Sequence, residues 1–85
     1  SVYSISDNQA EIIHAKALKS SRLVNKTLAE ANLPEGIRVG LIKRDDLIIV
    51  PNGDTTIELN DEIIFLSLMN DIEAAEELFQ VRDEY

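Results

Sequence analysis

The chain has 85 residues, 45% of them apolar, and a formal net charge of −8 at pH 7, which fits one small globular domain. It contains no cysteine, so disulfides, thiolate metal sites and cysteine nucleophiles are excluded, and it has no run of about 18 apolar residues that could cross a membrane. An acidic chain repels phosphate backbones, so we expect no nucleic-acid binding.

The charge is distributed unevenly along the chain. Seven Lys or Arg and four Asp or Glu precede Asp45, giving +3, whereas one Arg and twelve Asp or Glu follow from Asp45 onward, giving −11. The basic residues of the first half can attract a small anion, although such residues are more often a solvated face.

The first nine residues show no clean hydrophobic period. Val2, Tyr3 and Ile5 fit either a strand that pairs with the domain or a linker. We therefore treat residues 1–9 as a linker or N-terminal extension, and residues 10–85 as the domain itself.

A strand and a short helix are predicted next. Residues 10–18 suit a strand that is covered on both faces. Val24, Leu28 and Ala31 then fall on one helical face, and Ser21 or Asn25 can cap the start of this helix. The residues that end it are Asn32, Pro34 and Gly36.

Four further strands are predicted, at residues 37–43, 47–50, 55–59 and 62–68. Pro51 restricts the second of them to an edge or to its own end, and Asn52-Gly53 is a strong tight-turn signal. The last strand is the most apolar run in the chain, so we expect it at the centre of the sheet.

A second helix is predicted to begin at Asn70. Asn70 and Glu73 have the spacing of a capping box, and an apolar stripe follows at Ile72, Ala75, Leu78 and Phe79. The predicted order is β-α-β-β-β-β-α, an α+β fold with a small antiparallel sheet and two helices.

The sequence offers little for catalysis. His14 is the single histidine and lies within a predicted strand, and no serine has a nucleophile-elbow setting. The paired carboxylates, such as Asp45-Asp46, lie in turns or on a polar helix face, where solvent gives no acid–base asymmetry. We therefore predict that the chain is not an enzyme.

Phosphate and metal motifs are also weak. The three glycines form no dinucleotide-binding or Walker pattern. Asn52-Gly53-Asp54 with Glu58 lacks the alternating oxygen ligands of a calcium loop and is better explained as a turn. One hard cation bound by Asp45 and Asp46 stays open as an alternative.

The order of motifs resembles the TrkA-C domain, also called RCK-C, of the Trk potassium-uptake regulator family. The resemblance covers residues 10–81 and rests on these segments: Leu-Val-x-Lys-x-Leu at 23–28, Leu-Pro-Glu-Gly at 33–36, Ile-Lys-Arg at 42–44, Pro51, Leu59-x-Asp61 and Glu-x-Leu-Phe at 76–79. Asn25 and Asn60 stand where the family usually has glycine, and Asn also tolerates positive φ.

The resemblance implies a non-catalytic domain that dimerises, senses a ligand and reports to a membrane potassium transporter through the full-length protein. It implies no cofactor in this domain, because nucleotide is expected on a preceding N-terminal lobe. It also implies a cytoplasmic location, peripheral to the inner face of the plasma membrane through the transporter, without insertion into the membrane.

In the family, some members bind a small ligand such as cyclic di-AMP in a groove at the dimer axis. By resemblance, the ligand-binding residues here are Leu28, Ala29, Leu33, Pro34, Glu35, Arg38 and Pro51. Arg38 can pair with a phosphate, whereas Glu35 opposes one. The alternatives are a passive oligomerisation module of a cation or organic-anion transporter, or a domain that senses a cyclic dinucleotide or a divalent cation.

Overall fold

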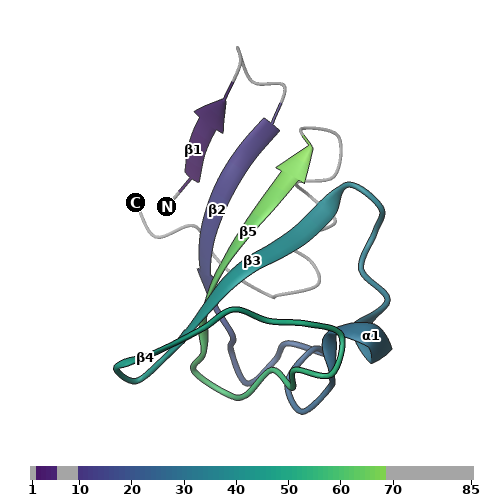
Figure 1. Cartoon of the computed structure of the whole chain (residues 1–85), viewed down its shortest axis with the longest axis vertical. Coiled ribbons are helices and arrows are strands. Elements are labelled where there is room, and N and C mark those ends of the chain that lie inside the picture. Colours follow the sequence, from purple (N-terminus) through teal and green to yellow (C-terminus); the bar gives the residue numbers. More distant parts are fainter. Residues whose placement is uncertain (1, 6–9, 69–85) are drawn as a thin grey trace.

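A five-stranded antiparallel sheet organises the chain (Figure 1). The computed structural model describes residues 2–5 and 10–68. The strands lie in the order β1-β2-β5-β3-β4. The elements are β1 (Val2–Ile5), β2 (Ala10–Lys16), α1 (Leu28–Ala31), β3 (Ile37–Arg44), β4 (Leu47–Ile49) and β5 (Glu62–Leu68).

The central strand is β5, as the sequence predicts. It pairs with β2 on one side and with β3 on the other, and it carries Ile63 and Phe65, both 0% exposed. Phe65 lies opposite Ile13 of β2 and Val39 of β3, so the apolar side chains of three strands meet on one face. We call this the inner face of the sheet, and its opposite the outer face.

An irregularity at Gly40 keeps β3 in phase with this core. The register with β5 shifts between Val39 and Leu41. Because side chains alternate between the faces of a strand, Ile37 and Ile42 would otherwise point to opposite sides. The extra residue lets both reach the inner face, where they are 3% and 0% exposed.

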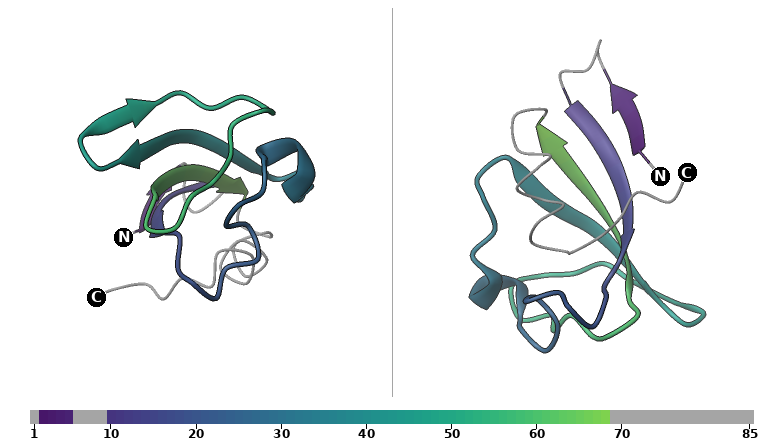
Figure 2. Two further views of the ribbon diagram at one scale, coloured as in Figure 1. Left: turned by 90° about the horizontal axis from the view of Figure 1, so that it is seen from below. Right: turned by 180° about the vertical axis from the view of Figure 1, so that it is seen from behind.

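The inner face is covered by segments that lie outside the strands. Ala17 and Leu23 follow β2, and Ile57 follows β4; all three are at most 1% exposed. Figures 1 and 2 show the chain after β4 running back to α1. Two backbone hydrogen bonds, from Asn25 to Ile57 (2.7 Å) and from Ile57 to Lys26 (2.9 Å), join the two covering segments.

The predicted helix is shorter than expected and has a different cap. It covers Leu28–Ala31, with Thr27 as its N-cap, so the assignment of the cap to Ser21 or Asn25 was wrong. Thr27 is better placed because Glu30 completes a capping box with it. Asn32 adopts the left-handed conformation (φ 48°, ψ 58°) and ends the helix.

Residues 55–59 do not form the predicted strand. The structure has only an isolated bridge there, between Thr27 and Thr56, because this segment forms single backbone bonds with the residues before α1 and joins no sheet.

The two predictions for the chain ends have different outcomes. Of the two options for Val2, Tyr3 and Ile5, the structure shows the strand, since β1 pairs with β2 from Val2–Ile13 to Ile5–Ala10. The predicted helix at Asn70 lies outside the described residues. Within the described part, no helix is long and apolar enough to cross a membrane.

Candidate functional site

A hollow of about 320 Å³ lies between α1, the chain that leads into β3, and the turn after β4. We call it the α1 hollow. Its lining residues are Leu28, Ala29, Leu33, Pro34, Glu35, Ile37, Arg38, Val39, Asn52 and Gly53.

Capping bonds fix the α1 wall of this hollow. The Thr27 hydroxyl accepts a hydrogen bond from the backbone N–H of Glu30 (3.1 Å), and the Glu30 carboxylate accepts one from the N–H of Thr27 (2.9 Å). The bond from the Thr27 backbone is the main reason that the pKa of Glu30 lies below its ordinary value. A helix of four residues is too short to be stable by itself. The two capping bonds therefore hold its first turn in place.

The opposite wall is joined directly to α1. The N–H of Ala29 donates to the carbonyl of Gly53 (3.0 Å), and that of Leu28 donates to Thr55 (3.0 Å). A methyl group added at Gly53 would lie 3.6 Å from Cβ of Ala29, so the two walls are already close to contact. The α1 hollow is therefore a defined part of the fold.

The α1 hollow carries one charge of each sign. Arg38 and Glu35 are both exposed, and they are the charged residues in the lining. Among the residues that the structure describes, neither makes an ion pair. No described residue therefore competes with an anion for the guanidinium of Arg38, and the carboxylate of Glu35 in the same lining opposes additional negative charge.

Six of the seven residues that the sequence assigned to a ligand site line this hollow. The seventh, Pro51, does not line it, but it precedes Asn52, which does. Sequence reasoning missed Ile37, Val39, Asn52 and Gly53 as lining residues. The first two flank Arg38 in the chain, and the last two form the turn that the sequence already signalled.

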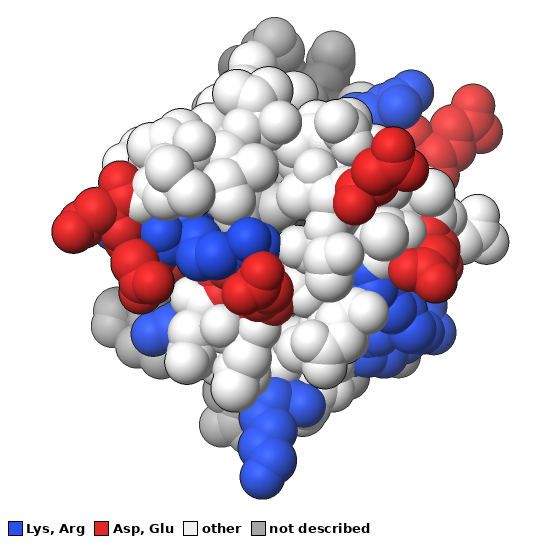
Figure 3. All heavy atoms as spheres, turned by 60° about the horizontal axis from the view of Figure 1, so that its bottom comes forward, with Lys and Arg blue, Asp and Glu red and all other residues white. Residues whose placement is uncertain are grey.

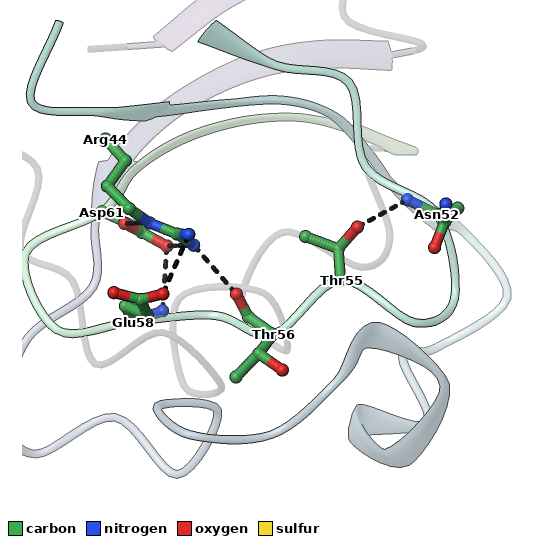
Figure 4. A network of polar contacts seen from close by, with 6 residues as sticks. All are labelled: Arg44, Asn52, Thr55, Thr56, Glu58 and Asp61. Atoms are coloured by element: carbon green, nitrogen blue, oxygen red, sulfur yellow. Dashed lines mark hydrogen bonds and ion pairs between the residues drawn. The ribbon is translucent and has the colours of Figure 1, made fainter. Parts of the chain in front are cut away.

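A polar network joins Arg44, at the end of β3, to the loop that precedes β5 (Figure 4). Arg44 donates from Nε and Nη2 to the two oxygens of Asp61, both at 2.9 Å, and from Nη2 to the carbonyl of Thr56 at 2.9 Å. Its Nη1 also pairs with Glu58 at 2.9 Å. The bond to Asp61 is the main reason that the pKa of Arg44 is raised, so Arg44 remains a fixed cation that holds the loop 50–61 to β3.

A second ionic group crosses the outer face. Glu62 of β5 accepts from Lys43 of β3 (3.4 Å) and contacts Nε2 of His14 on β2 (3.1 Å). Lys43 first, and His14 second, lower the pKa of the Glu62 carboxyl. His14 thus lies in a strand, as predicted, with its side chain exposed beside a carboxylate.

The proposed cation position at Asp45 and Asp46 is adjacent to a fixed positive charge. These residues line a hollow of about 460 Å³ together with Arg44 and Leu47. Within residues 2–5 and 10–68, no group of three or more His, Asp or Glu is placed to hold a metal ion. Figure 3 shows basic and acidic side chains interspersed on the face that it draws, with broad uncharged areas between them.

Comparison with known proteins identifies the class of domain. The family model for the TrkA-C domain matches residues 14–80, so the chain belongs to the TrkA-C family. A curated relative, the Trk system potassium uptake protein TrkA of Azorhizobium caulinodans, is 36% identical over 84 residues. The match covers 99% of this chain but only 18% of that protein, so the chain corresponds to a small part of it.

Solved structures share the fold. The RCK_C domain dimer of S. agalactiae BusR in complex with c-di-AMP has a TM-score of 0.71 and 21% identity, over 81% of this chain and 95% of that one. BusR in complex with its busAB-promotor DNA has a TM-score of 0.73 and 19% identity, over 100% of this chain and 42% of that one. At these identities the similarity concerns the fold of the domain.

Proposed function

We propose that the chain is a non-catalytic, dimerising regulatory domain of a Trk-type potassium-uptake regulator, and that its α1 hollow binds a small anionic ligand. The observation that carries the proposal is the α1 hollow itself, because six residues assigned from the family resemblance line one cavity, and one of them is Arg38, which forms no ion pair with a described residue. Sensing follows if the ligand favours one packing of the dimer over another.

Cyclic di-AMP is the first ligand to test. It is named in the complex of the BusR RCK_C dimer, whose fold this chain shares, and its phosphodiesters suit a guanidinium. Glu35 lies in the same lining and opposes a second negative charge, so we expect binding that depends strongly on Arg38.

The role in the parent protein follows from the family. In our proposal the domain reports to a membrane potassium transporter from the cytoplasmic side, peripheral to the inner face of the plasma membrane. We expect the nucleotide cofactor of the full-length regulator on a preceding N-terminal lobe, separate from the small ligand of the α1 hollow. The transporter partner and the location are inferred from the Azorhizobium relative, a potassium uptake protein.

Calorimetric titration of the purified chain with cyclic di-AMP, with light scattering on the same sample, tests the proposal. We expect a dimer that binds one ligand, and at least a tenfold loss of affinity in Arg38→Ala. Arg22→Ala is the matched control, because Arg22 is also exposed but lies outside the α1 hollow. A dimer that gives no heat would contradict sensing and leave a passive assembly module.

A further inference from the structure

The turn after β4 contains the pair Asn52-Gly53, which lies in the lining of the α1 hollow. Both residues are exposed. In such a pair the backbone nitrogen of the glycine can attack the side-chain carbonyl carbon of the asparagine, because glycine has no side chain to hinder the approach. This attack converts the asparagine into an acid and releases ammonia. Whether it occurs in the folded chain depends on how the reacting groups are held.

The hydrogen bonds that hold this turn use groups that do not react. The N–H of Asn52 donates to the hydroxyl of Thr55 at 3.0 Å (Figure 4), and the N–H of Thr55 donates to the carbonyl of Asn52 at 3.1 Å. The carbonyl of Gly53 accepts from Ala29. Within the described part of the chain, neither the N–H of Gly53 nor the side-chain NH2 of Asn52 donates a hydrogen bond. The attacking nitrogen and the leaving nitrogen are therefore both free to react.

The carbonyl group that is attacked is already polarised. The backbone N–H of Asp54 donates to Oδ1 of Asn52 at 2.8 Å. This oxygen becomes negative as the nitrogen bonds to Cγ, so a donor already in place stabilises the developing charge. The other asparagines that the structure describes each precede a residue with a side chain; they are Asn25, Asn32 and Asn60. Asn52 thus differs from them in the residue that follows it.

We propose that Asn52 deamidates spontaneously and that its product makes the α1 hollow acidic. The Gly53 nitrogen loses its proton to solvent and bonds to Cγ of Asn52. The bond from Cγ to Nδ2 then breaks, and Nδ2 takes a proton from solvent and leaves as ammonia. Water opens the resulting cyclic imide at either of its carbonyls, which gives aspartate or isoaspartate at position 52. The only co-reactant is water, so no oxidant, reductant or metal is needed.

The product adds a negative charge to the lining of the α1 hollow. Arg38 and Glu35 are the charged residues of the present lining, and their charges cancel. A carboxylate at position 52 leaves an excess negative charge there, which weakens the attraction for an anion. This consequence rests on the proposed function, whereas the reaction itself does not. The modification is irreversible in water, so it lowers the sensitivity of the domain as the protein ages.

Peptide mapping by mass spectrometry tests the reaction on the folded 85-residue chain, incubated at mildly alkaline pH. We expect the peptide with Asn52 to gain the mass of an amide-to-acid exchange well before the peptides that carry the other described asparagines. Gly53→Ala should slow this gain about tenfold, because a Cβ hinders the attacking nitrogen. The fold tolerates this substitution, since the added Cβ lies at an ordinary contact distance of 3.6 Å from Ala29, and thermal melting checks it.

The same incubation in guanidinium chloride separates the effect of the fold from that of the local sequence. If the unfolded chain loses the Asn52 amide but the folded chain keeps it, the fold protects the turn and the inference is wrong. An equal rate at Asn52 and at the other described asparagines would also overturn it. Neither result bears on the proposed function, because the mass measurement involves no ligand.

Calorimetric titration with cyclic di-AMP tests the consequence for the α1 hollow. Asn52→Asp should bind several-fold more weakly than the wild type, and Asn52→Gln, which keeps a neutral amide, is the matched control. Equal affinities of Asn52→Asp and the wild type would refute the effect on the hollow. If the wild type itself binds nothing, the proposed ligand binding fails together with this consequence, and the mass measurement still decides whether Asn52 deamidates.

Discussion

Arg44 and Asp61 form a two-pronged ion pair between β3 and the start of β5. Both hydrogen bonds are 2.9 Å long, and the side chain of Asp61 is 1% exposed whereas that of Arg44 is 27% exposed. The backbone N–H of Glu58 donates a third bond to the same carboxylate. The carboxylate is therefore the buried partner, and its stability in the fold depends on the arginine.

Replacing Arg44 should be costly because it leaves this carboxylate buried without a cation. We expect Arg44→Met to lower the free energy of unfolding by about 3 kcal/mol, the lower end for a broken buried pair, because Arg44 is partly exposed. Urea denaturation measures the change. Arg22→Met, at an exposed arginine outside the α1 hollow, is the control and should change stability by less than about 0.5 kcal/mol; equal losses would contradict a special role for the pair.

The capping box predicts a smaller effect at Thr27. Thr27→Ala removes the hydroxyl that accepts from Glu30, and such a loss typically costs about 1 kcal/mol. Thr27→Ser keeps the acceptor and should retain most of the stability. Thermal unfolding of the two variants separates the hydroxyl from the methyl group, and an equal loss in both would show that packing of the methyl group matters more.

The strands were predictable because their signals are local. The apolar run at 62–68, the β-branched run at 37–43 and the turn at Arg44-Asp45-Asp46 each specify one element, and the structure has β5, β3 and the β3–β4 hairpin there. Six of the ten lining residues of the α1 hollow came from the family resemblance, which carries the spatial proximity of Leu28 and Arg38 that periodicity alone cannot give.

The helix start and the loop at 55–59 were not predictable from local patterns. Val24 and Leu28 have helical spacing, yet Val24 packs against the core from a non-helical segment. Ile57 is fully buried like a strand residue, but its backbone bonds go to Asn25 and Lys26. The pairing of Arg44 with Asp61, 17 positions apart, depends on the closed fold and has no sequence period.

Substitutions at Asn60 test whether this position needs a residue that tolerates positive φ, as expected where the family usually has glycine. Its φ is 72°, in the left-handed region, and its N–H donates to Ala17 at 2.9 Å. We expect Asn60→Ala to cost about 1 kcal/mol, because the short polar side chain of Asn tolerates the left-handed conformation and the methyl group of Ala does not, and Asn60→Gly to cost nothing measurable, because glycine has no Cβ. Chemical denaturation compares them; if glycine were as harmful as alanine, the Asn side chain and not the conformation would matter.

The Glu62 ion pairs predict a pH dependence with a definite sign. Because Lys43 and His14 lower the pKa of Glu62 in the folded chain, the unfolded chain binds the proton more tightly. The stabilisation is therefore complete above the ordinary Glu pKa of about 4.3, and it is lost as the pH falls through the lower folded pKa. Thermal unfolding between neutral pH and about pH 3 should show a smaller fall in midpoint for Glu62→Gln than for the wild type. Lys43→Met should reproduce most of that difference, because Lys43 is the larger cause, and identical curves for all three proteins would contradict the assignment.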